Sequence, residues 1–319
     1  MKNILVIMPW LDDKLKCEIE DIASGCNVCY RNPGEISEED IGSADIIIGN
    51  VPAGMLREPD VEFMQLTSAG ADAYVPEGRL KRSTVLSCCT GAYSQTVAEH
   101  GLAATLMLQK DLHLYRDCQS KNKWLPGGTT SSMSGAVVLV MGLGEIGSYY
   151  ARQAKALGAY VIGFRRTMSE KPDFADELYT MESFDEVVGR ADVIFSVLPS
   201  TPATVHFYTR ERFEKMKPDA IFVNCGRGTA VSCDVLYEVL SEGLIRSAAV
   251  DVFETEPLPE DSPLWGLSNL LVTPHASGFF HLPATRDRVT NICLGNLRAW
   301  LKGDKVINIV DYNTGYKKK

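Results

Sequence analysis

The segment at residues 137–147 reads VVLVMGLGEIG, and it decides the fold. Its apolar first half fits a buried strand, and its second half is a G-x-G-x-x-G pattern that opens a helical stretch at 146–157. In such a unit the first glycine permits a tight turn, the second lets a pyrophosphate approach the backbone, and the third lets helix and strand pack closely. The N–H groups at the start of the helix then bind phosphate. We therefore expect dinucleotide contacts from Gly142, Leu143, Gly144, Glu145, Ile146 and Gly147, the alternative being three glycines in an ordinary turn.

Short apolar runs recur on both sides of this segment. Upstream they lie at 4–8, 28–30, 45–49, 64–67 and 84–87, and downstream at 160–164, 193–197, 221–224 and 248–252. Helical or turn stretches separate them, among them 184–188 and 233–241. This alternation is typical of parallel sheets covered by helices, so the fold class is α/β.

Three further segments complete the expected organisation. Apolar residues at steps of three and four predict one long helix at 97–117, which we expect to connect two domains, and residues 283–301 predict a final helix followed by a strand or extended segment at 306–310. Residues 126–135 are rich in Gly, Ser, Thr and Pro and predict a loop. A chain of 319 residues exceeds the ~100–200 residues of one domain, so we expect two.

Composition excludes several classes of partner. The net charge of −9 and the pI near 5.2 argue against binding to nucleic acid or to an anionic membrane. The apolar run at 4–8 is too short for a signal sequence or a membrane span, so we expect a cytoplasmic protein whose nine cysteines stay reduced. Cys26 and Cys29 form one isolated C-x-x-C, and we expect no metal site.

The residues after the second strand of the glycine-loop unit indicate the cofactor. An acidic side chain about 20 residues beyond the glycines would bind the adenosine 2′-hydroxyl, but this chain has Arg165, Arg166 and Thr167 there. Guanidinium groups favour a 2′-phosphate, so we expect NADP(H) to be preferred, with NAD(H) possible. Two exposed arginines without a ligand are the alternative interpretation.

Polar residues at later strand ends carry a resemblance to a known family. They form three segments, 224–228 (NCGRG), 251–258 (DVFETEPL) and 273–275 (TPH). Together with the glycine loop, Ser68-Ala69-Gly70, Val97-Ala98-Glu99 and the LPSTP segment at 198–202, they resemble the D-isomer-specific 2-hydroxyacid dehydrogenase family in motif order. The resemblance extends from about residue 45 to the C-terminus.

The resemblance implies a catalytic trio of Arg227, Glu256 and His275. Hydride addition to a keto carbon develops negative charge on its oxygen, which calls for a cation and a proton donor. Arg227 would pair with the substrate carboxylate and the keto oxygen, and His275 would give the proton in reduction and take it in oxidation. Glu256 would fix the imidazole ring and favour its protonated form. Each residue by itself also fits an ordinary loop position.

The resemblance also implies ligand contacts outside this trio. The substrate would be bound by Ser68, Ala69 and Gly70, whose amides form a small anion nest, together with Arg227 and His275. Asp251 would contact the nicotinamide carboxamide. Further cofactor contacts would come from Leu198, Pro199, Thr204, Cys225, Gly226 and His275. His281 is a weaker candidate for the substrate pocket.

The architecture implied by the resemblance is two doubly wound, Rossmann-like parallel-sheet domains with a cleft between them. The substrate domain would be discontinuous, residues 1–99 plus 285–319, and the dinucleotide-binding domain would be residues 100–284. Members are typically homodimers, and Trp124 stands where relatives place a tryptophan of the dimer loop.

The expected activity is NAD(P)H-dependent reduction of a small 2-keto acid, such as glyoxylate or hydroxypyruvate, to the D-2-hydroxy acid. A dehydrogenase for a larger 2-hydroxy acid or for 3-phosphoglycerate is the alternative within the class, and formate oxidation is disfavoured because those relatives have glutamine at Glu256. A dinucleotide-sensing corepressor is the alternative outside it. Some members have an asparagine near residues 87–90, where this chain has Ser-Cys-Cys-Thr, which leaves details of the substrate pocket open.

Overall fold

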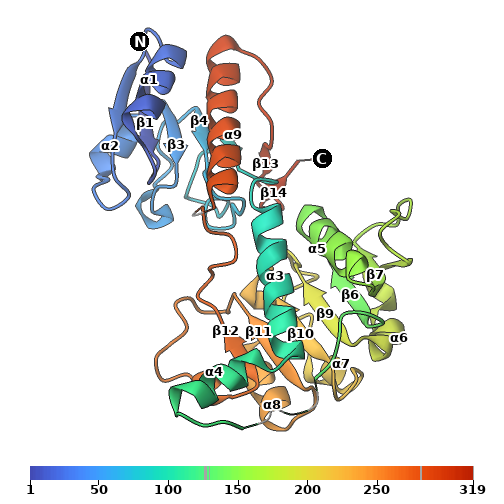
Figure 1. Ribbon diagram of the computed structural model, residues 1–319. Helices are drawn as coiled ribbons and strands as arrows, with labels where there is room; N and C mark the ends of the chain where they lie inside the picture. Colours follow the sequence, from blue (N-terminus) through green and yellow to red (C-terminus); the bar gives the residue numbers. More distant parts are fainter. Residues whose placement is uncertain (126–127, 129, 281, 319) are drawn as a thin grey trace. The chain divides into compact units, whose positions relative to one another are not determined.

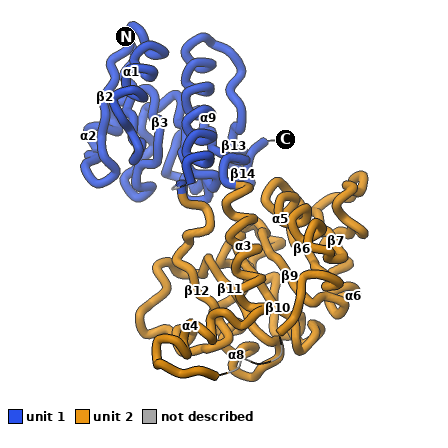
Figure 2. Tube along the Cα trace, in the orientation of Figure 1, with its two compact units in different colours: residues 1–93, 280–319 blue, residues 94–279 orange. Residues whose placement is uncertain are grey.

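The computed structural model describes residues 1–125, 128, 130–280 and 282–318. The chain forms two compact units (Figure 2), unit 1 comprising Met1–Tyr93 with Phe280–Lys319 and unit 2 comprising Ser94–Phe279. No helix within the described ranges is both long and apolar enough to cross a membrane.

Unit 1 is built on a parallel five-stranded sheet in the order β2-β1-β3-β4-β5, of which Figure 1 labels β1, β3 and β4. All of its neighbouring strands pair in parallel. The strands are β1 (Asn3–Ile7), β2 (Asn27–Tyr30), β3 (Ile46–Gly49), β4 (Phe63–Gln65) and β5 (Val85–Ser87), each within two residues of a predicted run. Both faces are buried, because Ile4 and Val6 pack on one side and Leu5 and Ile7 on the other.

The α-helices of the described part of unit 1 are α1 (Asp13–Ile22), α2 (Glu38–Gly42) and α9 (Pro283–Lys302). The predicted C-terminal helix is confirmed as α9. Proline at its first position fixes a helical φ, and Gly303 ends it in the left-handed region with φ 75°. Ser87 forms a bridge with Ile309, and Val310–Asp311 (β13) pairs antiparallel with Tyr316–Lys317 (β14). The predicted extended segment at 306–310 is therefore confirmed at Ile309 and Val310, whereas residues 307–308 form a bend with Asn308 at φ 58°.

Unit 2 is a parallel seven-stranded sheet in the order β12-β11-β10-β9-β6-β7-β8. Its strands are β6 (Val137–Met141), β7 (Tyr160–Arg165), β8 (Glu177–Thr180), β9 (Val193–Ser196), β10 (Ile221–Asn224), β11 (Ser247–Val250) and β12 (Leu270–Val272). After β6 the chain forms β7 and β8 on one side of that strand. It then returns to form β9, β10, β11 and β12 in succession on the other side of β6. This reversal between β6 and β9 is the switch point at which doubly wound sheets bind ligands, so the predicted fold class is confirmed.

Helices cover both faces of this sheet. On one face α3 (Ser94–Gln109) packs against β10, β11 and α5 (Glu145–Ala156), whose Tyr150 stacks on Phe195 with ring centroids 3.8 Å apart. On the other face α6 (Phe184–Val187), α7 (Arg210–Glu214) and α8 (Cys233–Ser241) share one apolar core with Ile194 and Phe222. Because successive strand residues point to opposite faces, both layers are buried, as the continuous apolar runs predicted.

The prediction of one long helix at 97–117 is wrong. The chain leaves the helix after Gln109 and begins a second one, α4 (Leu112–Ser120), with Asp111 in the left-handed region at φ 54°. Arg246 Nη2 donates to Asp111 Oδ1 over 2.7 Å and to the carbonyl of Leu108, which anchors the break. Apolar residues keep their steps of three and four across the break, so the sequence pattern does not indicate it.

Several short elements were not predicted. These are α1, α2 and α7, the half-buried edge strand β8, and the three-residue strand β12. Of the predicted loop at 126–135, residues 126, 127 and 129 lie outside the described part of the chain, and the others contain no helix or strand.

Candidate active site

Five motifs of unit 2 lie at one edge of its sheet. Each directly follows a strand: the glycine loop follows β6, residues 197–204 follow β9, and the loops of Arg227, Asp251 and His275 follow β10, β11 and β12. Parallel strands all end at the same edge, so the topology brings these motifs together.

The glycine loop has the geometry of a phosphate-binding turn. Gly142 has φ 98°, and the N–H of Leu143 donates to Phe164 O over 2.8 Å. A Cβ at Gly147 would stand 2.2 Å from Gly142 O, whereas a Cβ at Gly144 would meet nothing within 4 Å. Gly144 caps α5, and Glu145 at the helix start accepts a hydrogen bond from Ser94. Open space at the helix N-terminus thus fits a dinucleotide phosphate.

The loop after β7 holds Arg165 beside this turn. Arg165 Nε donates to Leu143 O over 3.1 Å, and Nη1 donates to Ser169 Oγ over 2.7 Å. Arg166 and Thr167 follow on the exposed surface. The guanidinium of Arg165 is therefore fixed at the glycine loop rather than extended into solvent.

The loop after β9 is closed by Thr204. Its hydroxyl accepts from Thr201 N over 2.9 Å and donates to Pro199 O, while Leu198 is buried. A Cβ at Gly226 would stand 2.7 Å from the backbone of Leu198, so glycine allows the β9 and β10 loops to approach. Thr204 therefore shapes the loop in which Leu198 and Pro199 lie.

Asn224, for which the sequence suggested no role, orients Arg227. Its buried side-chain oxygen accepts from Gly226 N over 3.1 Å, and its Nδ2 donates to Arg227 O over 3.1 Å. Arg227 is half-buried, and its Nη1 donates to Gly226 O over 3.0 Å. The sequence signal that could have identified Asn224 is a polar residue at the end of an otherwise apolar strand. Cys225 is buried between them, and burial raises the pKa of its thiol, which keeps it protonated.

His275 and Glu256 form a direct pair. Nδ1 of His275 lies 2.7 Å from Glu256 Oε2, and Glu256 Oε1 accepts from the N–H of Phe253 over 2.9 Å. His275 has φ 51°, and its N–H donates to Asp251 O over 2.8 Å. A left-handed histidine held by neighbouring loops is a constrained conformation of the kind found at functional sites. Its side chain is 55% exposed and thus open to a ligand.

Asp251 holds the loop that carries His275. It is 2% exposed, and its carboxylate accepts from Thr273 Oγ1 over 2.5 Å, Ala276 N over 2.8 Å and Ser277 N over 3.0 Å. These bonds use both carboxylate oxygens within the protein. The predicted contact to a nicotinamide carboxamide stays a prediction.

Comparison with known proteins agrees with this geometry. Residues 102–277 match the model of the D-isomer specific 2-hydroxyacid dehydrogenase, NAD binding domain. The chain belongs to this family. The enzyme is therefore an oxidoreductase, and unit 2 contains its NAD(P)-binding domain.

The relatives of the enzyme are named for different activities. It is 30% identical to a glyoxylate reductase of Korarchaeum cryptofilum, over 79% of this chain and 77% of the relative. It is 28% identical to a glyoxylate/hydroxypyruvate reductase B of an Enterobacter species over 98% of both chains. It is also 28% identical to a D-3-phosphoglycerate dehydrogenase of Methanocaldococcus jannaschii, of which it spans 60%.

Solved structures of the family match the whole chain. A D-isomer specific 2-hydroxyacid dehydrogenase family protein of Aeromonas salmonicida superimposes with a TM-score of 0.85 at 30% identity, covering 98% of this chain and 100% of its own. A family member of Xanthobacter autotrophicus, solved with NADPH and MES, gives a TM-score of 0.78 at 26% identity over 99% of this chain and 100% of its own.

The predicted substrate loop of the enzyme lies in unit 1. Ser68, Ala69 and Gly70 follow β4, and Ser68 Oγ donates to Gly70 O over 2.8 Å. The N–H of Cys89 donates to Ser68 O over 2.8 Å, so the segment in which this chain departs from some relatives supports the loop. His281 lies outside the described residues.

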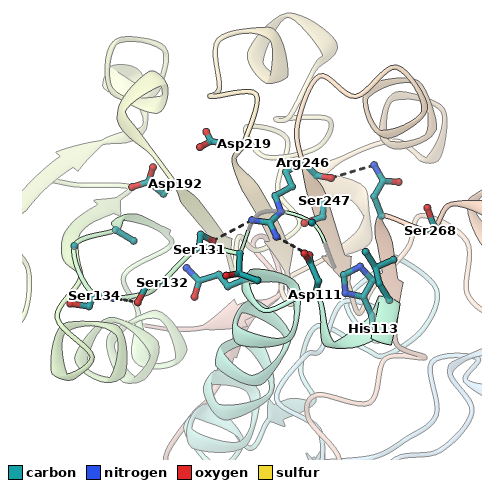
Figure 3. A pocket seen from close by; sticks show the side chains of 17 residues that line it. Asp111, His113, Ser131, Ser132, Ser134, Asp192, Asp219, Arg246, Ser247 and Ser268 are labelled. Carbon is teal, nitrogen blue, oxygen red and sulfur yellow. Dashed lines mark hydrogen bonds and ion pairs between the residues drawn. The ribbon is translucent and has the colours of Figure 1, made fainter. Parts of the chain in front are cut away.

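A pocket of about 620 Å³ lies at the opposite, amino-terminal edge of the unit 2 sheet. Figure 3 shows Arg246 within it, bonded to Asp111 and Ser131, with Asp192 and Asp219 nearby. The predicted catalytic residues follow the strands rather than precede them, so this pocket is separate from the catalytic edge.

Proposed function

We propose that the enzyme uses NADPH to reduce a small 2-keto acid, such as glyoxylate or hydroxypyruvate, to the D-2-hydroxy acid. The observation that carries the proposal is the 2.7 Å contact between His275 and Glu256, on the sheet edge that also holds Arg227 and the glycine loop. Bound dinucleotide supplies the hydride. The protein must supply a cation for the developing oxyanion and a proton for it.

Each residue of the trio has its own role in this proposal. Arg227 pairs with the substrate carboxylate and polarises the keto oxygen, and its backbone is fixed by Asn224. Because Glu256 engages Nδ1 of His275, Nε2 is the nitrogen that gives the proton to the oxygen. The Phe253 N–H holds Glu256 in turn, so the imidazole keeps one orientation during the transfer.

Arg165 supports NADPH as the preferred cofactor. Its guanidinium lies at the turn that would bind the pyrophosphate, where a carboxylate would repel a 2′-phosphate. Arg166 and Thr167 add a second cation and a hydroxyl to the same loop. The Xanthobacter relative solved with NADPH agrees with this preference. NAD(H) would bind more weakly because it lacks the phosphate.

The relatives favour a small substrate. Two of the relatives compared are named glyoxylate reductase and glyoxylate/hydroxypyruvate reductase B. The match to the second covers 98% of that relative's length. The phosphoglycerate dehydrogenase is a much longer protein. We place Ser68, Ala69 and Gly70 at the substrate carboxylate and assign unit 1 as the substrate domain.

A homodimer is part of the proposal. Trp124 is fully exposed and Leu125 is 55% exposed, and both lie within five residues of the end of α4, whose residues include none that is buried. Large exposed apolar side chains of this kind mark protein interfaces. Sedimentation of the wild type and of Trp124→Ser tests this part, with a wild-type monomer at micromolar concentration as the contrary result.

A panel of 2-keto acids tests the activity. Initial rates with glyoxylate, hydroxypyruvate, pyruvate, a branched 2-keto acid and phosphohydroxypyruvate are compared for NADPH and NADH. We expect the highest kcat/KM for glyoxylate or hydroxypyruvate with NADPH. Dinucleotide binding without turnover of any acid would refute the proposal and favour a dinucleotide-sensing protein.

A further inference from the structure

His100, in α3, belongs to a hydrogen-bonded chain that ends at the catalytic loop. Its Nε2 lies 3.2 Å from Thr273 Oγ1 and 3.9 Å from Asp251 Oδ1. The Thr273 hydroxyl donates to Asp251 Oδ1 over 2.5 Å. All three residues are in unit 2, and the mechanism proposed above gives His100 no task.

The direction of these bonds follows from the number of hydrogens. Thr273 has one hydroxyl hydrogen and gives it to a carboxylate, which only accepts. Nε2 of His100 must therefore carry a hydrogen and donate it to Thr273. The hydrogen bonds therefore run in one direction, from His100 through Thr273 to Asp251.

Asp251 connects His100 to His275. The Asp251 carboxylate also accepts from the N–H groups of Ala276 and Ser277, and its backbone carbonyl accepts from the N–H of His275. These bonds hold residues 275–277 and keep His275 at φ 51°. The hydrogen bond from His100 therefore supports, through Thr273, the carboxylate that organises the catalytic loop.

We propose that His100 is a positioning residue of the active site. The proposal rests on the proposed function, because the loop that this chain of hydrogen bonds supports carries His275. Without a donor at residue 100, Thr273 and Asp251 would lose the contact that ties them to α3. Residues 275–277 would then be held less firmly, and His275 would lose part of its fixed orientation.

Two substitutions separate the hydrogen bond from the imidazole ring. H100Q keeps an N–H donor close to the position of Nε2, and H100L removes the donor. H206Q is the matched control, because His206 pairs with Glu254 over 2.7 Å elsewhere in unit 2.

The experiment measures kcat and KM for the best 2-keto acid of the panel with NADPH, together with Kd for NADPH and Tm, in the wild type and the three variants. We expect H100L to lose kcat about tenfold with little change in KM or in Kd for NADPH, and H100Q and H206Q to retain kcat. Rescue by H100Q distinguishes the hydrogen bond from a general effect of replacing the ring.

The results can overturn this inference without affecting the proposed function. Equal kcat in H100L and wild type, or equal losses of kcat in H100L and H100Q, would remove the positioning role. Failure of the wild type to bind NADPH would instead refute the proposed function.

Discussion

Glu256 gives the proposed proton donor its charge environment as well as its orientation. Glutamine at this position keeps an acceptor for His275 Nδ1 but removes the negative charge beside the ring. Because that charge stabilises the proton donor, Glu256→Gln should lower kcat for reduction about tenfold or more and leave Kd for NADPH nearly unchanged. Initial rates with the best acid of the panel and cofactor titration measure both. A kcat equal to that of the wild type would show that the pair has no part in proton transfer.

Arg165 determines the expected cofactor preference. Charge-assisted hydrogen bonds contribute roughly 1.5–3 kcal/mol each, so Arg165→Asp should lower kcat/KM for NADPH about ten-fold to several hundred-fold and affect NADH little. Added salt should weaken NADPH more than NADH, because the contact is partly exposed. Lys305→Asp, the same charge change on exposed unit 1 surface, is the control. A wild-type preference for NADH would contradict the role of Arg165.

The turn from β6 to α5 contains two glycines with different expected roles, Gly147 in packing and Gly144 in ligand binding. A methyl group at Gly147 would collide with Gly142 O, so Gly147→Ala should lower the free energy of unfolding by about 1–3 kcal/mol. Gly144 faces open space, so Gly144→Ala should leave stability nearly unchanged and weaken dinucleotide binding. Thermal unfolding and cofactor titration of both variants check this. Two variants with equal stability loss, or tight binding by Gly144→Ala, would contradict it.

The edge strand β8 has a weak apolar pattern, and we expect hydrogen bonds to the charged side chain of Glu177 to stabilise it. Arg190 and Tyr179 donate to Glu177 and hold its pKa down to about 2. A depressed carboxyl pKa stabilises the fold above the ordinary value of 4.5, and this stabilisation is lost as pH falls toward 2. Glu177→Gln should therefore lower Tm at neutral pH and differ little from wild type near pH 2. Exposed Glu186→Gln is the control, and a Tm difference that persists in acid would contradict the prediction.

The elements that could be predicted from sequence are those with strong apolar patterns. The strands β6 and β10 and the helices α8 and α9 lie within one residue of the predicted ranges. The two strands are runs of apolar residues, and the two helices repeat apolar residues along one buried face. The break at Asp111 depends on Arg246, which is distant in sequence, so local periodicity gave no indication of it. Strands β8 and β12 are short or half-buried and leave a weak pattern.

For the molecule as a whole, motif order predicted the family, and the two parallel sheets confirm the fold class. The candidate site was predicted as far as it consists of side chains with recognisable chemistry, such as Arg227, Glu256 and His275. The supporting residues Asn224, Thr273 and His100 were missed, because their importance lies in hydrogen bonds of the folded chain. Asn224 bonds within the loop after β10, Thr273 bonds to Asp251 after β11, and His100 of α3 contacts Thr273. Such contacts are set by the doubly wound topology rather than by local sequence.

The central claim is that Arg227 stabilises the oxyanion that forms during reduction of a 2-keto acid. The direct measurement is kcat/KM for the best acid of the panel with NADPH in wild type and Arg227→Ala, together with Kd for NADPH in both. Loss of an oxyanion donor costs about 100-fold or more, so we expect at least that decrease with an almost unchanged Kd. A folded Arg227→Ala protein with near-normal turnover would contradict the account.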